Sequence, residues 1–229
     1  MGRFDVILWD MDGTLLDFAA AEAAAVKSLF PEFGLGTCTD GMLARYSAIN
    51  KTYWERLERG EMTKPQILVG RFAEFFRGEG LDESAAAPFN DAYQLRLGDT
   101  IVFRDHSREL VAALRGRVRQ YVVSNGTVAA QTKKLRRSGF DRLVDGVFLS
   151  EELGWEKPAR EFFDRVFQAI GDWDRDRVLI VGDSLTSDIA GGNRAGIRTC
   201  WYNPEGLPNT TGARVDFQLR DLGELPALL

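Results

Sequence analysis

The sequence has little histidine and little cysteine: one histidine, His106, and two cysteines, Cys38 and Cys200, among 229 residues. A single histidine excludes a metal site built from several imidazoles and leaves a histidine-dependent catalytic triad with one candidate. That candidate lies in Arg-Asp-His-Ser-Arg, where a surface position at the start of a helix is the simpler interpretation. Two cysteines form at most one disulfide, which excludes a disulfide framework and favours a reducing cytoplasm.

Long hydrophobic runs and an excess of basic residues are also missing. No apolar run approaches the roughly 20 residues that a membrane span needs, and the N-terminus lacks the basic-then-apolar layout of a signal peptide. The formal net charge is −5, which disfavours electrostatic binding to a nucleic acid polymer but still allows a small anionic substrate. We therefore expect a cytoplasmic protein with no membrane partner; nothing in the sequence indicates its oligomeric state.

Short apolar runs alternate with helical segments over much of the chain. The expected strands are Val6–Trp9, Tyr121–Val123, Val147–Leu149, Val178–Val181, Thr199–Tyr202 and, more weakly, Val215–Leu219. The expected helices between them are Ser107–Leu114, Val128–Ser138, Ala159–Ile170 and Ser187–Ala195. Strands that alternate with helices at this spacing predict an α/β fold, with a doubly wound (Rossmann-like), mostly parallel sheet covered on both faces.

The interval 17–97 breaks this alternation. Its pattern is helical throughout, with expected helices at Ala19–Phe30, Thr39–Leu57, Lys64–Arg77 and Glu83–Leu95. Glycines stand between these segments, where helix ends and turns are expected. The sequence therefore predicts an α/β core domain made of residues 1–16 and 98–229, with a helical cap domain at 17–97 inserted after the first strand.

The first strand runs directly into carboxylates, in 5-DVILWDMDGTLLD-17. Asp10 is expected at the carboxyl end of that strand, where open parallel sheets bind ligands, and Asp12 follows in a turn with Gly13 and Thr14. One carboxylate can attack phosphorus, while the other protonates the leaving oxygen and later deprotonates water. Because two anions repel an anionic substrate, this chemistry needs Mg²⁺. The alternative is a turn whose aspartates cap a helix.

A second acidic cluster repeats this design in 178-VLIVGDSLTSDIAGGNRAG-196. An apolar strand ends at Asp183, and Asp188 follows at an expected helix start, so Asp183 lies at the same edge of the sheet as Asp10. These two carboxylates can hold one Mg²⁺, with the backbone carbonyl of Asp12 as a further ligand. Asp188 is expected to support that metal site or to orient a lysine.

Two further segments offer groups that bind phosphate. In 121-YVVSNGT-127 a strand ends at Ser124 and Asn125, and a hydroxyl with backbone N–H groups at a helix N-terminus can cradle a phosphate. Lys157 precedes a proline and a helix, and as a fixed cation it would neutralise both the phosphate and Asp10. Each segment taken alone has an ordinary alternative, a turn for the first and a solvated lysine for the second.

Taken in order, Asp-x-Asp-Gly-Thr, Ser-Asn-Gly, Lys-Pro and Gly-Asp-x-x-x-Ser-Asp resemble the four motifs of the haloacid dehalogenase (HAD) superfamily. The resemblance spans nearly the whole chain and includes a helical cap in the first insertion position. It implies that Asp10 is the nucleophile and Asp12 the acid/base. Ser124 and Lys157 would bind phosphate, Asp183 would bind Mg²⁺, and Asp188 would be the second acidic residue of the last motif.

The position of Asp12 separates the branches of this superfamily. The dehalogenase branch has no aspartate there, and the P-type ATPase branch carries Asp-Lys-Thr-Gly-Thr, which Met11 and Asp12 do not match. The resemblance therefore implies a phosphatase. Three segments are also similar to the pyrimidine 5′-nucleotidase branch, which implies hydrolysis of nucleoside 5′-monophosphates: 49-INKTYWERLERGEMTKPQILVGRF-72, 151-EELGWEKP-158 and 191-GGNRAGIRTCWYN-203.

Side chains of the cap are expected to contact the leaving group of the substrate. Asn50, Trp54 and Arg71 combine an aromatic ring for stacking with polar groups for a sugar or base. The alternative for Trp54 is a place in the helical core of the cap, because aromatics recur there at helical spacing, and a surface salt bridge would explain Arg71.

Two other functions are compatible with these residues. One is a sugar-phosphate phosphatase or phosphomutase of the same superfamily, which shares the chemistry and differs in the product. The other is a non-catalytic regulator that binds a phosphoryl ligand, although such a protein would not need an acid/base at Asp12.

Overall fold

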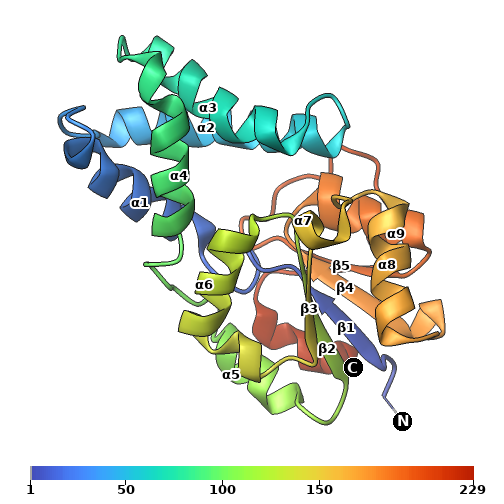
Figure 1. Cartoon of the computed structure of the whole chain (residues 1–229). Coiled ribbons are helices and arrows are strands. Elements are labelled where there is room, and N and C mark those ends of the chain that lie inside the picture. Colours follow the sequence, from blue (N-terminus) through green and yellow to red (C-terminus); the bar gives the residue numbers. More distant parts are fainter. Residues whose placement is uncertain (1) are drawn as a thin grey trace. The chain divides into compact units, whose positions relative to one another are not determined.

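The computed structural model describes residues 2–229, which form two compact units (Figure 1). The core unit consists of the chain up to Phe18 together with Ile101–Leu229, and the helical unit is Ala19–Thr100. The insertion that the sequence predicts, 17–97, starts and ends a few residues earlier than the helical unit. The two units are described separately below.

The core unit contains, across residues 2–229, a six-stranded sheet in the order β3-β2-β1-β4-β5-β6. All neighbouring strands are parallel, which confirms the predicted α/β fold. Sequence order reverses at β1, which lies between β2 and β4. The strands are β1 (Val6–Trp9), β2 (Arg119–Ser124), β3 (Gly146–Leu149), β4 (Val178–Gly182), β5 (Arg198–Tyr202) and β6 (Phe217–Leu219).

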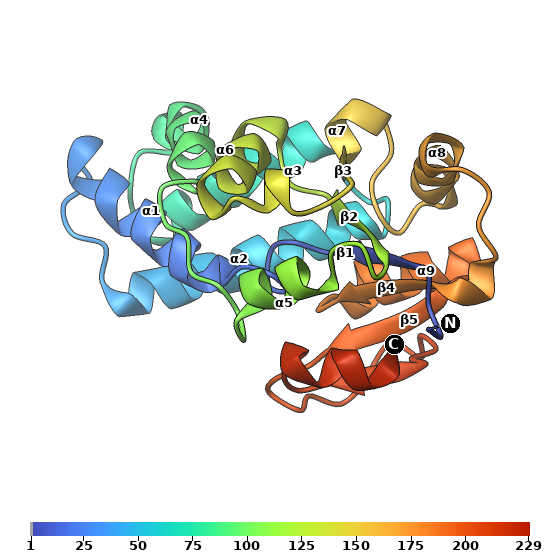
Figure 2. The ribbon, with the colours of Figure 1, turned by 90° about the horizontal axis from the view of Figure 1, so that it is seen from below.

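Helices cover both faces of this sheet, and Figures 1 and 2 show α5 (Ser107–Leu114) and α8 (Arg160–Ile170) on opposite sides of the strands. Alternate side chains of β1 enter the two hydrophobic clusters: Ile7 and Trp9 pack on the side of α5, and Val6 and Leu8 pack on the side of α8. A strand buried on both faces has to be apolar at every position, and this explains the uninterrupted run that predicted β1. The other core helices are α6 (Val128–Ser138), α7 (Ser150–Leu153) and α9 (Ala190–Ala195).

The register of the strands brings three polar turns together. Trp9 pairs with Val122 on one side and with Val181 on the other, so the carboxyl ends of β1, β2 and β4 lie next to one another. The backbone N–H of Asp10 continues the ladder by donating to the carbonyl oxygen of Val181 at 2.9 Å. The residues that follow these strands are therefore presented at one edge of the sheet.

The chain leaves the core unit and returns to it at neighbouring points. The backbone N–H of Asp17 donates to the carbonyl oxygen of Val102 at 2.8 Å, and the N–H of Arg104 donates to the carbonyl oxygen of Leu15 at 3.1 Å. An antiparallel bridge between Leu16 and Phe103 joins the same two segments. The core unit thus holds both ends of the insertion side by side.

The helical unit consists of α1 (Phe18–Glu32, which begins at the last residue of the core unit), α2 (Asp40–Glu58), α3 (Lys64–Gly78) and α4 (Ala86–Arg96). Aromatic rings form its interior, and the rings of Tyr46 and Phe72 stack at 4.8 Å between centroids. The side chain of Thr39 caps α2, and a capping box between Thr63 and Gln66 starts α3. Among residues 2–229, no helix has both the length and the apolar character that a membrane crossing requires.

The structure differs from the predicted secondary structure after β4 and β3. A helix was expected from Ser187, but a π-helical turn, η4 (Leu185–Ile189), precedes α9 and includes Asp188. The short helix α7 was not predicted, because four residues are too few to show a helical period. Short 3₁₀ segments complete the chain: η1 (Glu83–Ala85), η2 (Phe140–Arg142), η3 (Arg175–Arg177) and η5 (Leu222–Leu228).

Candidate active site

Lys157 is the centre of the polar cluster at the carboxyl ends of the strands. Its Nζ donates to Asp10 Oδ1 at 2.9 Å, to Asp188 Oδ1 at 2.7 Å and to the carbonyl oxygen of Val123 at 2.8 Å. Burial opposes the charge of Lys157, but the two carboxylates outweigh it and raise the pKa of the lysine. Lys157 is therefore a fixed cation that joins the ends of β1, β2 and β4.

Asp10 has one bonded and one unbonded carboxylate oxygen. Lys157 holds Oδ1, whereas Oδ2 is buried without a hydrogen-bond partner. Burial raises the pKa of Asp10 to about 7; Lys157 acts in the opposite direction, and the negative charge of Asp188 adds to the increase. Buried polar atoms are rarely left unbonded in proteins, so Oδ2 marks a place where a ligand atom is expected.

Three aspartates bring their carboxylates close enough to share a cation. Oxygen atoms of Asp10, Asp183 and Asp188 lie within 4.8 Å of one another. Both oxygens of Asp188 already accept hydrogen bonds, one from Lys157 and one from the backbone N–H of Ser184 at 3.1 Å. Asp10 Oδ2 and the carboxylate of Asp183 are therefore the atoms best placed to bind a metal ion, while Asp188 orients Lys157.

Asp183 is the most solvent-accessible of the three aspartates. Thr14 Oγ1 donates to Asp183 Oδ1 at 3.2 Å, and the backbone carbonyl of Asp183 accepts from Trp201 Nε1 at 2.9 Å. Desolvation and the charges of Asp10 and Asp188 raise the pKa of Asp183, although part of the side chain contacts solvent. Thr14 thus supports the carboxylate directly, and Trp201 fixes the turn that carries it.

Two glycines make room for these carboxylates. Gly13 has a φ of +95°, and a Cβ atom there would overlap the carboxylate of Asp183. A Cβ atom at Gly182 would overlap the carboxylate of Asp188. The glycines of the first and last motifs are therefore required by packing around the site as well as by turn geometry.

Ser124 and Asn125 close the site on the side of β2. Ser124 Oγ accepts from the backbone N–H of Gly126 at 3.1 Å, and its hydroxyl proton remains able to donate. Asn125 Oδ1 accepts from the N–H of Lys157 and its Nδ2 donates to the carbonyl of Lys157, both at 2.8 Å. The side chain of Asn125 therefore holds the backbone of Lys157, and its predicted contact with substrate stays a prediction.

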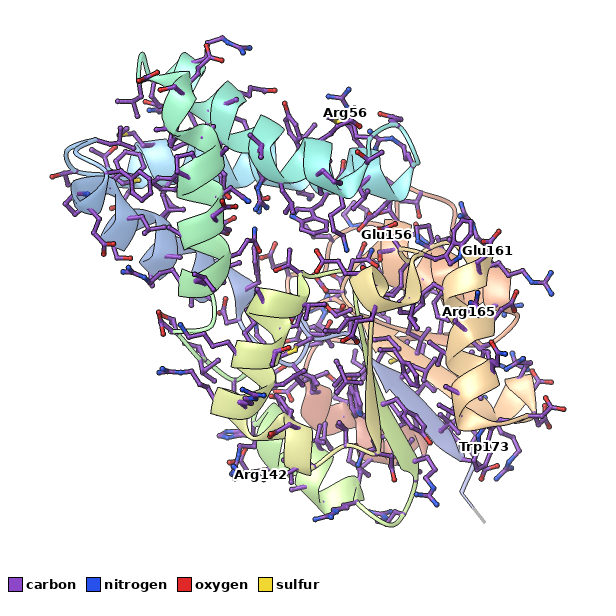
Figure 3. All side chains as sticks on the ribbon, in the orientation of Figure 1. Arg56, Arg142, Glu156, Glu161, Arg165 and Trp173 are labelled. Carbon is purple, nitrogen blue, oxygen red and sulfur yellow. The ribbon has the colours of Figure 1, made fainter. Side chains whose placement is uncertain are left out.

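Asp12 lies beside these groups but is bound by a different element. Its Oδ2 accepts from Gln131 Nε2 and its Oδ1 accepts from Lys134 Nζ, both at 2.5 Å, and both donors lie on α6. Sequence reasoning missed Gln131 and Lys134, and it also missed Trp201 and Glu151. The carboxylate of Glu151 accepts from the backbone N–H of Val128, the first residue of α6, at 2.7 Å. Figure 3 shows Glu156 on the loop between α7 and α8, the same loop that carries Lys157.

The predicted residues of the insertion lie in the helical unit, and their predicted contact with substrate stays a prediction. Asn50 and Arg71 are buried, and Arg71 donates from Nη1 to Asn50 Oδ1 at 2.6 Å. Trp54 is half-buried against the small hydrophobic cluster that contains Ile67. His106 belongs to the core unit, where it is exposed and directly precedes α5, as the sequence favours; its backbone there is left-handed, with a φ of +54°.

Comparison with known proteins places this geometry in a family. The model of the haloacid dehalogenase-like hydrolases matches residues 4–196. The HAD-hydrolase YfnB of Bacillus subtilis is 36% identical over all of this chain and 97% of its own length. The pyrimidine 5′-nucleotidase PynA of Streptococcus pneumoniae is 35% identical over 97% of this chain and 93% of its own, and YjjG of Escherichia coli, also a pyrimidine 5′-nucleotidase, is 30% identical over 99% and 98%.

Solved structures agree with this assignment. The crystal structure of YfnB, which is described as bound to magnesium, has a TM-score of 0.91 with 35% identity and covers 99% of each chain. L-2-haloacid dehalogenase from Xanthobacter autotrophicus has a TM-score of 0.75 with 19% identity over 98% of each chain, which shows a shared fold alone. The family match, the site at the strand ends and the order of the motifs agree. The chain belongs to the haloacid dehalogenase-like hydrolase family of enzymes.

Proposed function

We propose that this hydrolase is a Mg²⁺-dependent phosphatase that acts through an aspartyl phosphate on Asp10. The observation that carries the proposal is the buried, unpartnered Oδ2 of Asp10, in a carboxylate whose other oxygen is fixed by Lys157. Each carboxylate oxygen has two lone pairs, so Asp10 can hold Lys157, bind a cation and still attack phosphorus. Asp12 stands in the same turn, at the spacing of the family's Asp-x-Asp motif.

The reaction would proceed in two displacements at phosphorus. In the first, an oxygen of Asp10 bonds to phosphorus, the bond to the leaving oxygen breaks, and the carboxyl group of Asp12 gives its proton to that oxygen. In the second, a water oxygen bonds to phosphorus, the bond to Asp10 breaks, and Asp12 takes the proton of the water. Lys157 and the hydroxyl of Ser124 would hold the phosphoryl oxygens, and positioning supplies most of the rate enhancement.

The donor set fits a hard divalent cation. Asp10, Asp183 and the backbone carbonyl of Asp12 would hold Mg²⁺, which supplies neutralisation of the negative charge on the phosphoryl group when it is bound. Thr14 and Asp188 would support these ligands, because Thr14 donates to Asp183 and Asp188 orients Lys157, which in turn holds Asp10.

We propose nucleoside 5′-monophosphates, and pyrimidine nucleotides in particular, as the substrates. PynA and YjjG, which are both pyrimidine 5′-nucleotidases, match this chain over at least 97% of its length. The helical unit would act as the cap that selects the leaving group, with Trp54 the predicted contact that is least buried. The predicted cytoplasmic location also stays a proposal.

Phosphate release by the purified chain tests this function. With Mg²⁺ present, we expect turnover of UMP, dUMP and dTMP above that of sugar phosphates, and an Asp10→Asn variant of unchanged fold to lose at least about 1000-fold in kcat. Turnover that persists in Asp10→Asn would overturn the mechanism. A preference for sugar phosphates would keep the chemistry and reject the nucleotidase assignment, and an isomerised sugar phosphate without free phosphate would indicate a phosphomutase.

Binding of beryllium fluoride separates the enzyme from a non-catalytic regulator. This anion mimics a phosphoryl group on an aspartate, so the wild-type chain with Mg²⁺ is expected to bind it and the Asp10→Asn variant is not. Absence of both turnover and beryllium fluoride binding would favour the regulator.

A further inference from the structure

Two residues of α6 hold the carboxylate of Asp12 from both of its oxygens. Gln131 Nε2 donates to Oδ2 and Lys134 Nζ donates to Oδ1, both at 2.5 Å. The Lys134 side chain is only 2% exposed, whereas that of Asp12 is 22% exposed. A charged donor buried in the protein therefore faces a carboxylate that remains open on another side.

The local sequence explains why α6 reaches Asp12. Gln131 and Lys134 are three residues apart on the helix, so they lie on one face of it. The helix starts directly after the Ser-Asn-Gly turn of β2, and β2 pairs with β1, which carries Asp12 just beyond its end. A Cβ atom at Gly126 would overlap the side-chain amide of Gln131, so the glycine of that turn leaves the space through which Gln131 extends.

The surroundings of Lys134 fix it in this place. Its Nζ lies 5.3 Å from the centre of the Phe18 ring, a favourable contact between a cation and an aromatic face. Burying an ammonium group costs several kcal/mol unless an opposite charge compensates for it. The chain accepts this cost at a carboxylate that the fold does not need for its core, since Asp12 is partly exposed.

We infer that Lys134, assisted by Gln131, is a positioning residue for the acid/base Asp12; this inference rests on the proposed phosphatase function. Asp12 is a carboxylate after it has protonated the leaving oxygen and until it takes the proton of the attacking water. The ammonium group at Oδ1 and the amide at Oδ2 fix the direction of this side chain. Each carboxylate oxygen of Asp12 uses one lone pair to accept from a donor of α6, so its second lone pair remains for the leaving oxygen or for water.

The change Lys134→Met removes the charge and keeps an unbranched side chain. We expect kcat for a nucleoside monophosphate to fall by about 10- to 100-fold, because loss of acid/base geometry costs this much, while KM changes by less than about threefold. Arg136→Met is the matched control, since it removes a positive charge from the exposed face of the same helix. Its kcat and KM should equal those of the wild type.

A burst experiment distinguishes positioning of Asp12 from general damage to the site. p-Nitrophenolate leaves without needing a proton, so Lys134→Met should still release about one p-nitrophenol per active site in a burst, followed by slow steady-state turnover. Lys134→Arg should recover part of the lost kcat, because it restores the cation. A kcat of Lys134→Met within threefold of the wild type, or a lost burst in the folded variant, would overturn the inference.

Two further measurements keep the test decisive. If Lys134→Met does not fold, Gln131→Ala is measured in its place, with an expected loss of about 3- to 10-fold in kcat and the same retained burst. If the wild type releases no phosphate, or Asp10→Asn remains active, the proposed function has failed. Failure of Lys134 alone leaves wild-type activity and its dependence on Asp10 intact.

Discussion

Each unit of this protein buries a cluster of charged and polar side chains, and the two clusters differ in the hydrogen bonding of their carboxylates. In the core unit, Lys157 uses three donors but Asp10 keeps a buried oxygen without a partner. In the helical unit, both oxygens of Glu22 accept hydrogen bonds, from the hydroxyl of Ser47 and from Asn50 Nδ2 at 2.8 Å. One cluster is open to a further ligand atom, and the other satisfies its carboxylate internally.

In the cluster of the helical unit, the amide of Asn50 links the positive side chain of Arg71 to the negative side chain of Glu22 by hydrogen bonds. Arg71 donates to Asn50, whose own amide nitrogen donates to Glu22, and a second donor of Arg71 reaches Asn90 Oδ1 at 3.2 Å. Burial raises the pKa of Glu22, and the hydrogen bonds from Ser47 and Asn50 and the charge of Arg71 oppose that increase. The comparison teaches that charge and burial do not by themselves mark a functional site: the buried carboxylate of Asp10 keeps an unbonded oxygen, whereas that of Glu22 does not.

The largest expected effect tests the core cluster. Asp12→Asn should lower kcat by about 100- to 10,000-fold, because an amide neither donates a proton to the leaving oxygen nor accepts one from water. The melting temperature should also fall, because Lys134 then lies buried without the carboxylate that compensates its charge. Steady-state phosphate release together with thermal unfolding measures both quantities. Near-normal turnover would assign the proton transfers to another group.

The next effect tests the helical cluster and should appear in stability. Arg71→Met leaves Glu22 and Asn50 buried without the cation, and the free energy of unfolding should fall by about 3 kcal/mol, as for a broken buried ion pair. Urea unfolding measures this loss, and Arg77→Met is the control, because Arg77 lies on the same helix as Arg71 and forms an exposed ion pair with Glu83 of η1. A large rise in KM with unchanged stability would instead support the predicted contact of Arg71 with substrate.

The smallest effect is a change in the pH dependence of stability. The pKa of Glu22 is higher in the folded state than in the unfolded state, so the folded state binds the proton more tightly. Stability therefore falls as the pH rises above the ordinary glutamate pKa of about 4.3. Glu22→Gln removes this contribution. Its stability relative to the wild type should therefore increase with pH over that range, by at most about 1.4 kcal/mol for each pH unit. A parallel pH dependence in both proteins would show that Glu22 does not titrate differently on folding.

The sequence predicted the parts of the fold that local pattern controls. The bounds of β1, α5 and α6 match the expected ranges, because an apolar run or a helical period defines each of them without reference to the rest of the chain. The pair Asp10 and Asp183 was also expected at one sheet edge, since both follow buried strands of a parallel sheet. The π-helical turn at Asp188 and the short α7 have no such local signal.

Side-chain partners across long sequence distances were not predictable. Lys134 is 122 residues from Asp12, and on α6 it looks like any lysine of an amphipathic helix. Nor does local pattern indicate that both polar atoms of the Asn125 side chain bond the backbone of Lys157. Such contacts depend on how the elements pack, which one sequence does not state.

The adjacent exit and return of the chain, at Asp17 and Val102, give the core unit an unusual independence. To the parallel sheet, the whole of Ala19–Thr100 is one long loop whose two ends are already joined by backbone hydrogen bonds. Lengthening a loop between fixed ends costs little free energy, since the entropy of closure grows only with the logarithm of length. The insertion can therefore be enlarged, exchanged or rebuilt over evolutionary time while the strand order and the position of Asp10 stay as they are.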